Sequence, residues 1–67
     1  MSPKTIQAIR AAIRMPTSAS DVAMKTKVPV EAVYQALVRM EALGEAQVRI
    51  DHGAAPHRRI SVEWVAA

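Results

Sequence analysis

The spacing of the apolar residues changes once along this chain, at Gly44, and that change restricts the possible folds. Before Gly44 the apolar residues recur every three or four positions, which is typical of amphipathic helices. After Gly44 apolar and polar residues alternate, which is the pattern of strands with one buried face. Because 67 residues leave room for only one small domain, we expect a single α+β domain over residues 1–67, with helices first and a two-stranded β-hairpin last.

The first helix is expected at about residues 3–14. Ser2 and Pro3 suit an N-cap followed by proline at the first helical position. Pro16 closes the segment, because the residue before a proline is pushed out of helical geometry. The apolar stripe of this helix consists of Ile6, Ile9, Ile13 and the intervening alanines.

Two further helices are expected at about residues 18–26 and 29–43. Ser18 can cap the shorter helix, and Asp21 can complete a capping box in which aspartate replaces the usual glutamate or glutamine. The longer helix carries an apolar stripe at intervals of three and four and ends at Gly44. That stripe consists of Val30, Val33, Leu37, Met40 and Leu43.

The alternating part predicts two strands of a hairpin, at about residues 46–51 and 58–65. The segment between them, from His52 to His57, contains the glycine and the proline of a projecting loop. Trp64 in the second strand is expected to cover the hydrophobic core against the first helix, and the alternative is an interface with a partner.

The charge balance favours a nucleic-acid partner. Nine Lys and Arg against six Asp and Glu give a net charge of +3, and the pI is near 10.0. A pI above about 9 is expected of nucleic-acid binders. The absence of cysteine excludes a disulfide framework, and together with the lack of a secretory signal it predicts a cytoplasmic protein. No stretch approaches the roughly 20 apolar residues of a membrane span, so no membrane association is expected.

Catalytic and metal-binding chemistry is not indicated by the sequence. The acidic residues are expected on separate surfaces rather than in a shared cleft, and neither His52 nor His57 has an evident Ser or Cys partner for nucleophilic catalysis. A metal site needs at least three ligands, and only Asp51 lies near the two histidines. We therefore expect no enzyme activity, no cofactor and no bound metal.

Several segments carry a resemblance to a known family. Ser18–Ala23 looks like the family's second helix, with a small alanine where two helices cross, and Val28 follows in the turn. Val33 and Leu37 match the inward residues of the third helix, and Arg39–Ala46 looks like a helix end, a glycine stop and the entry into a β-hairpin. Over almost its whole length the chain thus resembles the winged helix-turn-helix domains of bacterial and phage transcription factors. The resemblance implies a three-helix domain with a hairpin wing, although winged helices also serve as protein–protein modules.

The turn before the third helix departs from the family. Its usual glycine is in a left-handed conformation, and this chain has Lys27 before Val28. A Cβ atom costs roughly 1 kcal/mol in that conformation. Either the lysine bears this cost or the turn has a different shape, and Pro29 can compensate by limiting the unfolded ensemble.

The resemblance implies that the third helix lies in the major groove and that the hairpin loop touches the backbone or the minor groove. Gln35 can then pair with adenine, and Arg39 can reach guanine or a phosphate, whereas the alternative for both is an ordinary solvated helix face. Glu31 can read cytosine or complement the helix dipole. Tyr34 can stack at DNA or anchor a protein partner. The full outward set is Glu31, Ala32, Tyr34, Gln35, Val38 and Arg39.

Phosphate contacts are expected from cations beside the third helix, with scattered solubility charge as the alternative. The candidates are Lys25 and Lys27 before that helix and Arg58 and Arg59 at the returning base of the wing. Backbone N–H groups at the start of the second and third helices can also bind phosphates, with the hydroxyls of Ser18 and Ser20 assisting.

The sequence therefore predicts sequence-specific binding to double-stranded DNA by a small transcriptional regulator. Because one such domain makes few contacts, a homodimer or a cooperative oligomer is expected. The alternative is an adaptor that binds another protein through an apolar patch of Val30, Tyr34 and Val38.

Overall fold

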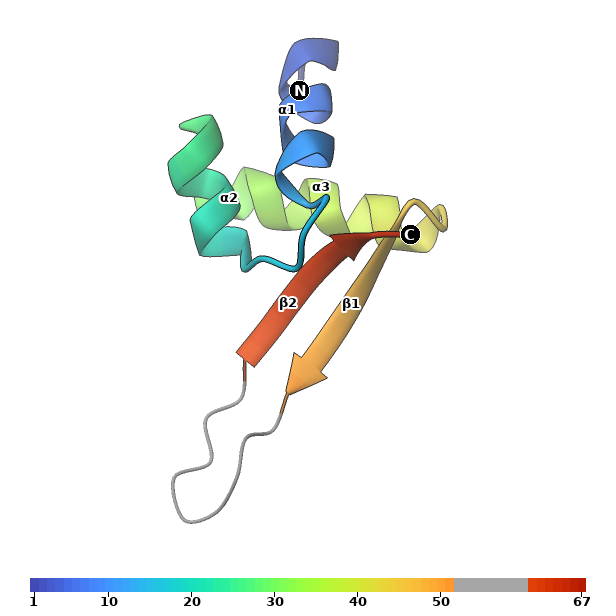
Figure 1. The fold of residues 1–67 in the computed structure, drawn as a ribbon. Helices are drawn as coiled ribbons and strands as arrows, with labels where there is room; N and C mark the ends of the chain where they lie inside the picture. The colour runs from blue at the N-terminus through green and yellow to red at the C-terminus, as the bar shows by residue number, and fades with distance from the viewer. Residues whose placement is uncertain (52–60) are drawn as a thin grey trace.

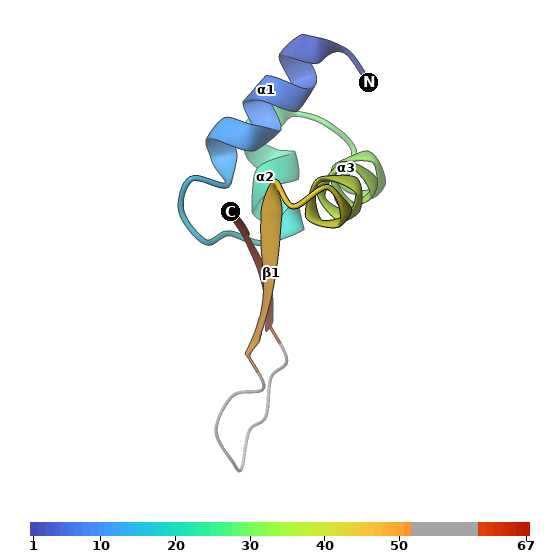
Figure 2. The ribbon, with the colours of Figure 1, turned by 90° about the vertical axis from the view of Figure 1, so that its right-hand side faces the viewer.

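The computed structural model describes residues 1–51 and 61–67 and shows three helices followed by an antiparallel hairpin (Figure 1). This confirms the predicted α+β class and its winged-helix arrangement. The hairpin projects away from the layer formed by the helices (Figure 2). The elements are α1 (Pro3–Ala12), α2 (Ala19–Thr26), α3 (Val30–Ala42), β1 (Ala46–Asp51) and β2 (Ser61–Ala66).

The start of α1 is as predicted, but its end is not. Ser2 is the N-cap, its hydroxyl oxygen accepts a hydrogen bond from the Thr5 N–H at 3.3 Å, and proline stands at the first helical position. The helix ends at Ala12, two residues before the predicted end at 14. Beyond it the Arg14 N–H donates to the Ala11 carbonyl, three residues back, at 3.4 Å, so the α-helical pattern does not continue. The carbonyl of Ile13 accepts a hydrogen bond from the Ala66 N–H at 2.8 Å and so holds β2.

The capping box predicted for α2 is half present. The Ser18 hydroxyl oxygen accepts a hydrogen bond from the Asp21 N–H at 3.1 Å, which confirms Ser18 as the N-cap. Among the described residues no reciprocal bond joins the Asp21 carboxylate to the Ser18 N–H. The aspartate side chain is one methylene shorter than the glutamate that usually makes this contact.

The end of α3 is a Schellman motif built on Gly44. This glycine has φ +77°, the left-handed conformation that a residue without Cβ adopts freely. The Glu45 N–H donates to the Met40 carbonyl at 2.8 Å, and the Gly44 N–H donates to the Glu41 carbonyl at 3.0 Å. The predicted glycine stop is thus confirmed, and it directs the chain into β1.

A short third pairing anchors the hairpin to the helices. Thr17 forms an isolated antiparallel bridge with Trp64, with N–H to carbonyl distances of 3.0 and 2.7 Å. β2 therefore lies between β1 on one side and the α1–α2 connection on the other. The sequence reading did not predict this bridge. Of the predicted second strand, residues 58–60 lie outside the described residues.

The core lies where the three helices meet the base of the hairpin. Trp64 is only 5% exposed and shares one apolar cluster with Ile9 and Ile13, which confirms its predicted place in the core next to the first helix. Most of the other buried residues are helix residues spaced three or four positions apart. The complete buried cluster is Ile9, Ile13, Val22, Val33, Leu37, Met40, Ala46 and Trp64.

Candidate nucleic-acid interface

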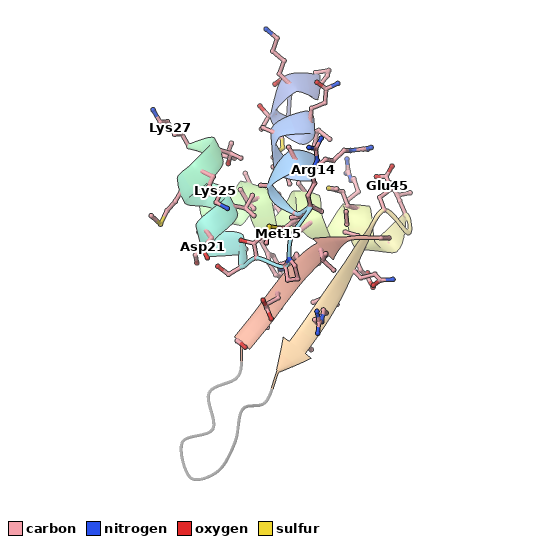
Figure 3. The ribbon with its side chains drawn as sticks, viewed as in Figure 1. Arg14, Met15, Asp21, Lys25, Lys27 and Glu45 are labelled. Carbon is pink, nitrogen blue, oxygen red and sulfur yellow. The ribbon has the colours of Figure 1, made fainter. Side chains whose placement is uncertain are left out.

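The turn between α2 and α3 has the conformation expected of the family, although it contains no glycine. Lys27 is the C-cap of α2, with φ 58° and ψ 30°, which is left-handed. The alternative of a differently shaped turn is therefore wrong, and Lys27 bears a cost of about 1–2 kcal/mol. Its side chain extends outward from the end of α2 (Figure 3). The turn delivers the chain to Pro29, the N-cap of α3, with φ −54°.

The surface of α3 that faces away from the core divides into two flanks. The polar flank consists of Gln35 and Arg39, four residues apart and both exposed. The apolar flank consists of Val30, Tyr34 and Val38, which are 46%, 54% and 41% exposed. Residues four apart lie on the same side of a helix, so the division follows directly from the sequence spacing. The two flanks adjoin at Gln35, which also lines a shallow hollow with Val30 and Tyr34.

The polar flank borders a groove of about 630 Å³ between α1 and α3. Its floor contains Ile6, Ala32 and Ala36, and three of the predicted site residues line it. Those three are Lys27, Gln35 and Arg39. The structure thus brings together a cation from the turn, an amide and a guanidinium, all beside one helix. This is the donor set that phosphate and base-edge contacts require.

An ion pair that the sequence reading missed closes one end of this groove. The Arg10 Nη2 atom lies 3.1 Å from both carboxylate oxygens of Glu45. The two side chains are 51% and 38% exposed, so solvent screens the pair and its contribution to stability is small, about 0.2–1 kcal/mol. It ties α1 to the residue after the glycine stop, and no sequence pattern joins positions so far apart.

Lys25 does not lie with Lys27. It lines a shallow hollow between α1 and α2 together with Arg14 and Met15. Lys27, by contrast, lines the groove between α1 and α3. The predicted pairing of these two lysines beside α3 is therefore not observed.

The predicted phosphate-binding helix starts lie close to the outward face of α3. Val30, Glu31, Tyr34 and Gln35 share a shallow hollow with Ala19 of the first turn of α2. Ser18 uses its hydroxyl oxygen as the N-cap acceptor, and Ser20 is exposed in the same turn. Glu31 is exposed in the first turn of α3, where a negative charge complements the helix dipole.

Tyr34 is directed towards the hairpin. Its ring meets that of Trp64 edge to face, with centroids 6.0 Å apart and planes at 86°. Tyr34 is nevertheless 54% exposed, so one side of the ring packs on the core and the other is free. The outward position predicted for it is thus correct only in part.

The remaining residues considered in the sequence analysis belong to the segment between β1 and β2. Arg58, Arg59, His52 and His57 lie outside the described residues. Within residues 1–51 and 61–67, no group of three or more His, Cys, Asp or Glu side chains is arranged to hold a metal ion. The helices of that part of the chain are all too short or too polar to cross a bilayer.

Comparison with known proteins adds no family assignment. The chain matches no protein-family model, no curated protein and no solved structure. The functional argument therefore rests on the chain's own residues and their arrangement.

Proposed function

We propose that the protein binds double-stranded DNA in a sequence-specific manner, as a small transcriptional regulator. The observation that carries the proposal is the helix–turn–helix formed by α2, left-handed Lys27 and α3, with Lys27, Gln35 and Arg39 lining one side of the exposed helix. An α-helix fits the major groove of B-DNA, and its exposed amide and guanidinium groups reach base edges there.

Each member of this set has a distinct role. Gln35 pairs with adenine through its amide, which offers a donor and an acceptor together. Arg39, one turn further along, contacts guanine or a phosphate. Lys27 projects from the turn before α3 and binds the phosphate backbone, which fixes the position of the helix without reading sequence.

The overall charge supports the same partner. A net charge of +3 attracts the polyanionic backbone and accelerates encounter with it. The proposal also retains Arg58 and Arg59 of the wing as phosphate contacts, by resemblance to the family, and the backbone N–H groups at the start of α2 as a further phosphate site.

A second candidate function is an adaptor that binds another protein. The apolar flank favours it, because Val30, Tyr34 and Val38 are exposed side by side on a helix where DNA readers usually carry polar groups. Such an adaptor binds DNA weakly and without sequence preference.

Fluorescence anisotropy tests the proposal. Labelled duplexes of random sequence and of the DNA upstream of the protein's own gene are titrated with protein at several salt concentrations. We expect tighter binding to the upstream duplex and a linear loss of log affinity with log salt, by about 0.9 per phosphate contact. Equal, weak binding to both duplexes contradicts sequence-specific binding to this DNA and favours the adaptor.

The matched variants are Lys27→Ala and Lys25→Ala, which remove the same charge from residues that line different hollows. We expect Lys27→Ala to weaken binding to every duplex and to reduce the salt slope by about 1, whereas Lys25→Ala leaves the slope unchanged. Gln35→Ala reduces the preference for the upstream duplex without changing the slope, because it contacts a base and carries no charge.

A further inference from the structure

The outer edge of β1 is unpaired. In the described sheet β2 has neighbours on both sides, whereas β1 has β2 on one side only (Figure 1). Trp64 exchanges both of its backbone hydrogen bonds with Thr17. Successive residues of an antiparallel strand direct their backbone groups to opposite sides, so Glu63 and Val65 direct theirs to β1.

The register then identifies the free backbone groups of β1. Glu63 faces Arg49, and Val65 faces Gln47, so these two residues of β1 are the ones that bond to β2. Val48 lies between these two residues, and Ile50 follows Arg49. Both direct their N–H and carbonyl groups away from β2. The edge therefore offers a regular row of donors and acceptors to another strand.

Of the devices that protect edge strands, Ala46–Ile50 of the described chain has only one charged side chain, Arg49. Native proteins protect edge strands with proline, lysine or a bulge, and Ala46–Ile50 has no proline, no lysine and an unbroken register with β2. The side chains of Val48 and Ile50 are 38% and 57% exposed, and Val62, 39% exposed, lies opposite Ile50. The exposed backbone row thus borders an exposed apolar face.

We propose that a second copy of this chain pairs with β1 along this edge, antiparallel and about a two-fold axis, to form a four-stranded sheet. About a two-fold axis the edge can pair with itself, because each copy supplies the same outward N–H and carbonyl groups of β1. The axis also places the apolar faces of the two hairpins on the same side of the sheet, where they adjoin.

Strand overlap and charge together select the register. Outward groups must meet outward groups, so Val48 pairs with the second copy's Ala46, Val48 or Ile50. Pairing with Ala46 aligns only residues 46–48 of each β1, whereas the other two arrangements align residues 46–50 or 47–51. Pairing with Ile50 sets Arg49 directly opposite the second copy's Arg49, and like charges in that position are destabilising. Pairing with Val48 sets Arg49 opposite the second copy's Gln47, so the proposal commits to the pairing of Val48 with Val48.

Stable interfaces bury at least about 600 Å² on each partner, which is about an eighth of the 5070 Å² that this chain exposes. The apolar surface continues from the hairpin to Tyr34, which packs on Trp64, and along the apolar flank of α3. The proposed contact is made by the edge of β1 and uses neither Lys27 nor Arg39, so the inference goes beyond DNA binding and does not depend on it.

Single cysteines test the geometry, because the chain has none of its own. In the proposed dimer the two Val48 Cα atoms are about 5.5 Å apart, as in any hydrogen-bonded antiparallel pair, which is within disulfide range. Val62→Cys is the matched control, since Val62 and Val48 are equally exposed. The two Val62 residues are separated by three strand spacings across the sheet, so they are at least about 14 Å apart and cannot be bridged.

Under mild oxidation without DNA, we expect Val48→Cys to form a disulfide-linked dimer at least tenfold faster than Val62→Cys. Faster bridging by Arg49→Cys than by Val48→Cys overturns the proposed register. Equal, slow bridging by Val48→Cys and Val62→Cys overturns the edge as the contact.

Sedimentation equilibrium, also without DNA, tests the dimer in the unmodified chain. We expect a mass that rises with concentration towards twice 7.3 kDa, and a dissociation constant at least tenfold higher for Val48→Lys than for Val62→Lys, with unchanged circular dichroism. A mass of one chain up to millimolar concentration overturns the proposal, and so does equal weakening by the two lysines. Since no DNA is present, these outcomes leave the DNA-binding proposal to its own test.

Discussion

Tyr34 of α3 and Trp64 of β2 meet edge to face, with ring centroids 6.0 Å apart, and they are the only two aromatic residues of the chain. Trp64 is buried in the core and also bonds through its backbone to Thr17. The contact therefore connects the exposed face of α3 with the strand that anchors the hairpin. It helps to set the position of α3 relative to the hairpin. A binding surface that includes both α3 and the hairpin depends on that position.

Replacing Tyr34 tests this contact. Tyr34→Ala removes the edge-to-face pair and part of a buried ring, and we expect it to lower the free energy of unfolding by about 1–2 kcal/mol. Tyr34→Phe keeps the ring, and the hydroxyl has no bond to lose among the described residues, so we expect a change below about 0.5 kcal/mol. Urea unfolding followed by circular dichroism measures both. Equal destabilisation by the two variants refutes a role for the ring contact.

Glycine substitutions at Lys27 and Lys25 are expected to change the free energy of unfolding in opposite directions. Lys27→Gly removes the Cβ atom from a left-handed residue, and we expect it to raise the free energy of unfolding by about 1 kcal/mol. Lys25→Gly places a glycine inside α2 and is expected to lower it by about 1 kcal/mol. Thermal and urea unfolding of the two variants give the comparison. If both glycines destabilise the protein, Lys27 is not left-handed in solution.

The two serines at the start of α2 are expected to contribute differently to the free energy of unfolding. Ser18→Ala removes the acceptor for the Asp21 N–H, and we expect a loss of about 1 kcal/mol in the free energy of unfolding. Ser20 lies inside the first turn and makes no hydrogen bond through its side chain among the described residues, so Ser20→Ala is neutral or slightly stabilising. Denaturant midpoints of the two variants decide the matter, and equal midpoints contradict the assigned N-cap.

Most of the fold could be predicted because its signals are local. Ser18 lies next to the helix that it caps, and Gly44 lies at the point where the apolar period changes. The pairing of Thr17 with Trp64 could not be predicted, because a single bridging residue produces no alternation in the sequence. The hydrogen bond from the Ala66 N–H to the Ile13 carbonyl could not be predicted either, since it joins residues far apart in the sequence.

Single residues of the candidate site could be predicted from the sequence, but their grouping in space could not. Gln35 and Arg39 were expected on the exposed face of α3, and both are exposed there. Lys25 and Lys27 were grouped because they are close in sequence, whereas they line different hollows of the structure. Lys27 leaves the helical pattern because it is left-handed, and no glycine marks that position in the sequence. The ion pair between Arg10 and Glu45 had no sequence signal, because it joins two elements brought together by the core.

The central claim is that the polar flank of α3 and Lys27 together contact DNA, and amide chemical-shift mapping tests it most directly. A chain of 7.3 kDa suits two-dimensional ¹H–¹⁵N spectra, recorded as the upstream duplex is added. We predict the largest shifts at Lys27, Gln35 and Arg39 and small shifts at Lys25 and Arg14. Shifts confined to the α1–α2 hollow of Lys25 and Arg14, with none on the polar flank, would contradict the account.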